Sequence, residues 1–164
     1  MPSILFVCRA NQFRSPIAAS IFQQELKLHG IRSGWRVESA GTWAKTGSIV
    51  PYDVLVWANQ LGVSGISRHV CRQVTSEILD PFDLIIVMEN SQKEAIQSEF
   101  ISKKEFIYLL SEMVDGQIYD IPDPARPGVD PELIISDIRS HIQNNFHLII
   151  ELAEKLHLQR VSSD

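Results

Sequence analysis

The sequence has few cysteines, no long hydrophobic run and no excess of positive charge. Only Cys8 and Cys71 carry thiols, which excludes a framework of structural disulfides and favours reduced cysteines. No apolar run approaches the roughly 20 residues that span a bilayer, and the first residues do not have the pattern of a signal peptide. The formal net charge of -5 argues against a surface that binds nucleic acid. We therefore expect a cytoplasmic protein with neither a membrane nor a nucleic acid as partner.

The composition is that of a globular protein. Hydrophobic residues make up 45% of the chain and charged residues 21%, which is far from the composition of disordered chains. A chain of 164 residues suits one domain with a substantial core, and no repeat, low-complexity tract or linker divides it. We expect a single domain over residues 1–158 and a frayed tail over residues 159–164.

Short apolar runs alternate along the chain with segments of helical spacing. Strands are predicted at 3–8, 34–42, 83–89 and 105–110. Helices are predicted at 15–30, 51–62, 74–81, 90–100 with Asn90 as its cap, and 131–157 as one final helix. This alternation predicts a parallel sheet covered on both faces. Residues 111–131, rich in Asp, Pro and Gly, are expected to form a long loop, and loops of that length are often functional.

The segment "VCRANQFRSP" places a cysteine where the first strand gives way to a helix. Ligands of parallel sheets bind beyond the carboxyl ends of the strands, and Cys8 lies at such an end. Backbone N–H groups at a helix start attract an anion and stabilise a thiolate. After five intervening residues, Arg14 offers a guanidinium that can grip two phosphate oxygens, and Ser15 offers a hydrogen bond to sulfur. A lone buried cysteine is more often a core residue, but this spacing favours a nucleophile in an anion site.

The stretch "LFVCRANQFRSPIAA" resembles the signature loop of the low-molecular-weight protein tyrosine phosphatases. Further segments resemble other blocks of that family in the same order, at 37–42, 67–75, 83–89 and 120–128. The resemblance covers nearly the whole chain and implies a single-domain α/β fold whose four-stranded parallel sheet has helices on both faces. It also implies a phosphomonoesterase that forms a cysteinyl-phosphate and acts on phosphotyrosine in proteins or on similar aryl phosphates. Inorganic phosphate is the product, and neither a cofactor nor a metal is required.

The same resemblance implies a role for particular residues. Cys8 is the expected nucleophile, Arg14 the group that stabilises the phosphoryl oxygens, and Asp123 in "DIPDP" the general acid. Judged alone, Asp123 is a turn former, and Asp120 is the less favoured acid. The expected phosphate-binding residues are Arg9, Ala10, Asn11, Gln12, Phe13, Arg14 and Ser15. The residues expected to support this loop are Asn11, Ser15, Ser39 and His69. Trp43 and Gln12 are candidates for the substrate rim, although Trp43 fits a partly buried core position equally well.

Three positions depart from the family pattern. Ala10 replaces a glycine, Phe13 replaces a second cysteine, and Ala125 replaces an aromatic residue that would wall the substrate pocket. Ala10 and Ala125 leave open a catalytically weak module that binds a phosphorylated partner. A thiol-dependent arsenate reductase is a third alternative, for which Cys71 is the only other thiol in the chain.

Overall fold

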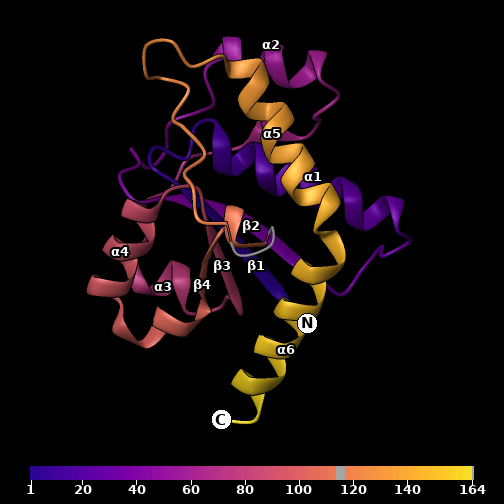
Figure 1. Cartoon of the computed structure of the whole chain (residues 1–164), viewed down its shortest axis with the longest axis vertical. Coiled ribbons are helices and arrows are strands. Elements are labelled where there is room, and N and C mark those ends of the chain that lie inside the picture. Colours follow the sequence, from indigo (N-terminus) through magenta and orange to yellow (C-terminus); the bar gives the residue numbers. More distant parts are fainter. Residues whose placement is uncertain (114–116, 164) are drawn as a thin grey trace.

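The computed structural model, which describes residues 1–113 and 117–163, has a central parallel sheet with helices on both faces (Figure 1). Its four strands are β1 (Ser3–Cys8), β2 (Arg36–Gly41), β3 (Leu84–Val87) and β4 (Ile107–Leu109), in the order β2-β1-β3-β4. Cys8 pairs in register with Gly41, and Val7 pairs with Val87. The predicted α/β class and four-stranded parallel sheet are confirmed.

Alternating side chains of β1 contact two different helical layers. Ile4, Phe6 and Cys8 face the core formed with α1 (Arg14–Leu28), α5 (Pro131–Asn144) and α6 (Phe146–Val161). Leu5 and Val7 face the core formed with α3 (Ser76–Leu79) and α4 (Asn90–Glu99). The remaining helix, α2 (Tyr52–Gln60), contacts α5. Short 3-10 turns occur at Ile66–Arg68, Ile101–Phe106 and Ser111–Met113.

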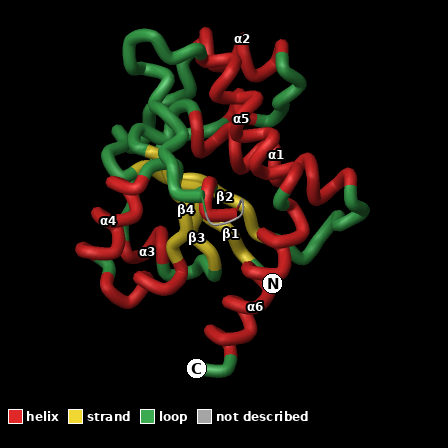
Figure 2. The backbone as a smooth tube through the Cα atoms, viewed as in Figure 1, coloured by secondary structure: helices red, strands yellow, loops and turns green. Residues whose placement is uncertain are grey.

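Most of the long loops gather at one end of the sheet (Figure 2). These loops follow the carboxyl ends of the strands, where the sequence placed the site. The long loop predicted at 111–131 includes a 3-10 turn at its start, and its residues 114–116 lie outside the described part. None of the described helices combines the length and apolar character needed to cross a bilayer.

Several predicted boundaries were wrong. The expected final helix is two helices, because Asn145 leaves helical geometry and its side chain donates to the His141 carbonyl at 2.9 Å. The tail that we expected to fray from residue 159 is helical through Val161, because Arg160 is anchored at 2.7 Å to buried Asp83. The cap of α4 is Glu89 and not Asn90, since the Glu89 side chain and Gln92 form a reciprocal capping box.

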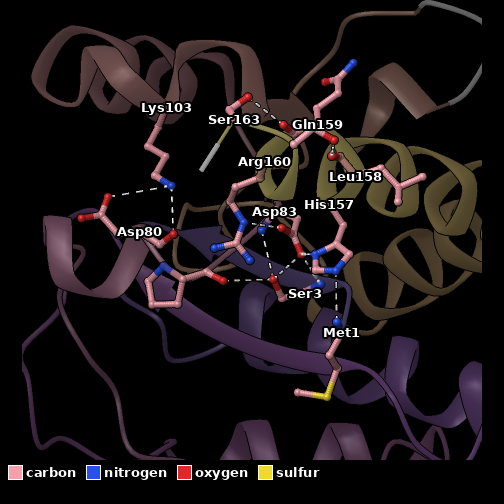
Figure 3. Close-up of polar contacts among 12 residues, drawn as sticks. Met1, Ser3, Asp80, Asp83, Lys103, His157, Leu158, Gln159, Arg160 and Ser163 are labelled. Atoms are coloured by element: carbon pink, nitrogen blue, oxygen red, sulfur yellow. Dashed lines mark hydrogen bonds and ion pairs between the residues drawn. The ribbon is translucent and has the colours of Figure 1, made fainter.

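Asp83, directly before β3, anchors α6 to the amino end of the sheet (Figure 3). Its carboxylate accepts hydrogen bonds from the Ser3 hydroxyl at 2.7 Å, from Arg160 and from His157 Nδ1 at 3.1 Å. The Met1 ammonium, which can only donate, lies 3.1 Å from His157 Nε2, so the ring proton of a neutral His157 sits on Nδ1. Burial alone raises the pKa of Asp83, but the hydrogen bonds from Ser3, His157 and Arg160 outweigh it and hold the pKa below its usual range.

Candidate active site

The loop of residues 8–15, called here the Cys8 loop, joins the carboxyl end of β1 to the start of α1. Within the described part of the chain, the backbone amides of residues 9–15 have no hydrogen-bond acceptor. Free amides at a helix start form a site for an anion, because the helix dipole adds to their own partial charges. The geometry of this loop therefore suits the binding of a phosphate group.

Asn11 holds the Cys8 loop in shape. Its φ of 57° is the only positive value at a described non-glycine residue, and asparagine tolerates this region better than most residues. Its Nδ2 donates to Ser15 Oγ at 2.8 Å and to Ser39 Oγ at 2.9 Å, while its Oδ1 accepts from the Arg72 amide at 3.0 Å. His69 Nε2 lies 3.0 Å from the Asn11 carbonyl. The structure thus brings together the four residues predicted to support the loop.

His69 is a neutral donor in this network. Its Nε2 faces two acceptors, the Asn11 carbonyl and, at 3.1 Å, Asn11 Oδ1, so Nε2 must bear the proton. Burial lowers the pKa of His69, the charge of Arg72 lowers it further, and the hydrogen bond to Asn11 only partly offsets them. The second thiol, Cys71, donates to the same Asn11 carbonyl at 3.1 Å, and burial raises its pKa. Both groups therefore support the loop as uncharged donors.

The sulfur of Cys8 lies 3.1 Å from Ser15 Oγ. The Ser15 hydroxyl accepts from Asn11 and has a single proton to donate. That proton can point to the Ala40 carbonyl at 3.2 Å or to the sulfur. A negative charge on the sulfur draws the proton toward Cys8, so Ser15 is placed to stabilise a thiolate.

Arg14, near the end of the Cys8 loop, is buried, and one edge of its guanidinium is occupied. Nη1 donates to the carboxylate of Glu89 and, at 2.8 Å, to the carbonyl of Ile121. Nη2 lies 3.5 Å from Asp123 Oδ2, and no acceptor among the described residues meets Nε. The edge formed by Nε and Nη2 is therefore available for two phosphate oxygens.

Sequence reasoning missed Glu89 as a partner of Arg14. Glu89 follows β3 directly, as Cys8 follows β1, and neighbouring parallel strands bring their carboxyl ends to one edge of the sheet. This position at the carboxyl end of a neighbouring strand was the feature of the sequence that could have identified Glu89 as a residue of the site.

Asp123 lines the same pocket as Cys8, whereas Asp120 does not. The Asp123 side chain is 24% exposed, and its Oδ1 accepts from the Ala125 amide at 3.0 Å. Asp120 instead accepts from the Asn90 amide at 2.7 Å, at the start of α4. The structure therefore places Asp123, and not Asp120, in the pocket that Cys8 lines.

The pocket above Cys8 has a volume of about 240 Å³ and includes Ala10 and Gln12. Phe13 and Trp57 form an aromatic wall, with ring centroids 6.1 Å apart, while Ala125 in the same lining contributes no aromatic side chain. Asp53 adds a second carboxylate to the lining. Sequence reasoning missed Asp53 and Trp57, because α2 reaches the site only through tertiary packing.

Trp43 lies outside this pocket. Its side chain is 73% exposed and lines a neighbouring groove, where the Arg9 guanidinium lies 4.8 Å from the centre of its ring. The core alternative for Trp43 is thereby excluded. Of the two predicted rim residues, Gln12 borders the Cys8 pocket and Trp43 borders the adjacent groove.

The substitution at Ala10 is accommodated without backbone strain, because its φ is not positive. The glycine that the site does require is Gly41, where an added Cβ would lie 2.5 Å from the Arg9 carbonyl. In the described ranges, no cluster of three or more His, Cys, Asp or Glu side chains is arranged to hold a metal ion.

Comparison with known proteins gives consistent matches. The family model described as "Low molecular weight phosphotyrosine protein phosphatase" matches residues 3–160. A protein-arginine-phosphatase of Bacillus subtilis is 28% identical over 159 residues, covering 96% of this chain and 98% of that protein. A probable low molecular weight protein-tyrosine-phosphatase, EpsP of Ralstonia nicotianae, is 38% identical over 125 residues, covering 76% and 79%. The crystal structure of YfkJ from Bacillus subtilis superposes with a TM-score of 0.82 at 28% identity, covering 92% and 96%.

Proposed function

Because this chain belongs to the low molecular weight phosphotyrosine protein phosphatase family and is a cysteine-dependent phosphatase, we propose that Cys8 is its nucleophile. One arrangement supports this proposal above all. The Cys8 sulfur lies beside the Ser15 hydroxyl, in a pocket that also holds the Arg14 guanidinium and the Asp123 carboxylate. A nucleophile, an anion-binding group and an acid therefore surround one space.

In the first step, the Cys8 thiolate attacks phosphorus. A sulfur–phosphorus bond forms, the bond from phosphorus to the leaving oxygen breaks, and its electron pair moves to that oxygen. The amides of the Cys8 loop and the open edge of Arg14 stabilise the equatorial oxygens. Protonated Asp123 gives its proton to the leaving oxygen.

In the second step, the Asp123 carboxylate takes a proton from a water molecule. The water oxygen attacks phosphorus, the sulfur–phosphorus bond breaks, and inorganic phosphate is released. The electron pair returns to sulfur, and the Ser15 hydroxyl, whose oxygen lies 3.1 Å from that sulfur, stabilises the departing thiolate. Neither step needs a cofactor.

The aromatic wall of Phe13 and Trp57 favours phosphotyrosine in proteins, or a similar aryl phosphate, as the substrate.

A cytoplasmic location fits this proposal, because the reaction needs a reduced thiol and both cysteines are free.

The test is hydrolysis of phenyl phosphate and a phosphotyrosine peptide by the wild type and by Cys8→Ser. We expect the wild type to hydrolyse both substrates. Cys8→Ser should stay folded but lose this activity, because a serine hydroxyl is barely ionised at neutral pH. Binding of the peptide by the wild type without release of phosphate would instead identify a phosphate-binding module. Retention of more than a few per cent of the activity by Cys8→Ser would exclude Cys8 as nucleophile.

A second candidate substrate is phosphoarginine in proteins. Two carboxylates, Asp53 and Asp123, line the pocket where the leaving group sits, and a guanidinium would be attracted to them and could stack on Trp57. The relative of Bacillus subtilis that covers 96% of this chain is a protein-arginine-phosphatase.

The two candidate substrates are distinguished with two peptides that have the same sequence except for the phosphorylated residue, which is phosphotyrosine in one and phosphoarginine in the other. If the substrate is phosphoarginine, Asp53→Asn should lower kcat/KM for the phosphoarginine peptide much more than for the phosphotyrosine peptide. Equal effects on both peptides would remove Asp53 from substrate recognition.

A further inference from the structure

A second groove adjoins the catalytic pocket, and Asp123 lines both. This groove has a volume of about 360 Å³. It lies between the Cys8 loop, the end of β2, the start of α4 and the loop that contains Asp123. A protein substrate whose phosphorylated residue enters the pocket must place a neighbouring residue near this groove, since consecutive residues are only about 3.8 Å apart.

Two arginines and two carboxylates line the groove, and its most exposed charges are those of the arginines. Arg9 forms no ion pair within the described part of the chain, and its guanidinium is held over the exposed ring of Trp43. The Arg126 side chain is 64% exposed and lies 3.4 Å from one oxygen of Glu89. The other oxygen of Glu89 is bound to Arg14, so a single carboxylate is shared between two arginines. Asp123, which also lines the groove, lies 3.5 Å from Arg14 Nη2. The guanidiniums of Arg9, Arg14 and Arg126 therefore outnumber the two carboxylates, and within the described residues Arg9 is the arginine left without a counter-charge.

The adjacent catalytic pocket is lined by a different set of charged side chains. Asp53 and Asp123 line it, and no arginine other than Arg14 does. Because Asp123 lines both hollows, the two differ in Asp53, which lines only the pocket, and in Arg9 and Arg126, which line only the groove. Such a division of charge selects the residues that flank the phosphorylated one, because mismatched charges are repelled.

We propose that this groove, bordered by Arg9, Trp43 and Arg126, binds a Glu or Asp side chain next to the phosphorylated residue of a protein substrate. This inference rests on the proposed function. Guanidiniums bind carboxylates through paired hydrogen bonds, and the Trp43 ring restrains Arg9 before the substrate arrives. The apolar part of the substrate side chain packs on the exposed face of Trp43.

The experiment uses phosphotyrosine peptides that differ only in the neighbouring residue, which is Glu, Gln or Lys, placed before or after the phosphorylated one. For each enzyme, kcat/KM is measured for every peptide and expressed relative to the Gln peptide. Taking the ratio within one enzyme cancels any change in basal turnover. The variants are Arg126→Gln, Arg126→Glu and the double variant Arg9→Gln with Arg126→Gln. Arg32→Gln, which alters an exposed arginine outside both hollows, is the matched control.

We expect the wild type and Arg32→Gln to prefer Glu over Gln about two- to fivefold on at least one side, as suits partly exposed ion pairs. The preference should shrink in Arg126→Gln, disappear in the double variant and turn toward Lys in Arg126→Glu. High salt should weaken it in the wild type. Equal rates for the Glu and Gln peptides on both sides would overturn the inference, as would a preference that survives in the double variant. If the wild type does not hydrolyse phenyl phosphate at all, the proposed function itself is refuted.

Discussion

Replacing Glu89 by Gln should destabilise the protein strongly, because it leaves the Arg14 guanidinium buried without its main counter-charge. The side chains of Arg14 and Glu89 are only 2% and 8% exposed. Removing one partner of a buried ion pair costs about 3–5 kcal/mol. We expect about 3 kcal/mol, the low end of that range, because Gln keeps a hydrogen-bond acceptor and Asp123 lies 3.5 Å from Nη2. For a domain of this size, that loss corresponds to a fall in Tm of about 6–12 °C.

The assay is equilibrium unfolding in urea, with the free energy extrapolated to water. Asp80→Asn is the control, because Asp80 is 65% exposed and 3.8 Å from Lys103, so its loss should cost at most about 1 kcal/mol. Inorganic phosphate should stabilise the wild type and Glu89→Gln, since it binds the folded state. A Glu89→Gln variant as stable as Asp80→Asn would show that Arg14 does not depend on Glu89, and the argument from burial would be refuted.

Three other perturbations test the site and the fold. Asp123→Asn should slow the first step with phenyl phosphate by about 10²- to 10⁴-fold, as measured by rapid mixing. The loss should be much smaller with a nitrophenyl ester, because its leaving group needs no proton. Equal losses with the two esters would show that Asp123 is not the acid. The depressed pKa of Asp83 gives the folded state stability that is present above the unfolded pKa of about 3.9 and is lost as pH falls through the lower folded pKa. Asp83→Asn should therefore flatten the decline in unfolding free energy below about pH 4, and an unchanged acid profile would contradict this. Phe13 occupies the position where a second thiol would protect the Cys8 nucleophile from oxidation. Prolonged exposure to peroxide should therefore inactivate the Cys71→Ala variant irreversibly. Full recovery of its activity with a dithiol would show that another group protects Cys8.

The sequence predicted those parts of the molecule that depend on local pattern. Residues 3–8 form a buried strand because their apolar run is short and continuous, and the helix after the Cys8 loop follows from its spacing and from Pro16 in its first turn. The position of Cys8 at the edge of a parallel sheet follows from this order of elements. The helix boundaries were predicted less accurately, because the break at Asn145 and the helical end of α6 depend on single side-chain contacts.

By itself, the sequence determined the α/β class, the parallel sheet and the grouping of cysteine, arginine and serine in one loop, because these depend on residues close together in the chain. Only the tertiary structure decided which distant groups surround that loop. Glu89 reaches Arg14, Trp57 reaches Phe13, and Arg126 reaches Glu89 across 75, 44 and 37 positions of sequence. Such contacts are set by how helices and loops pack on the sheet, and a local pattern of residues does not encode the packing of segments so far apart.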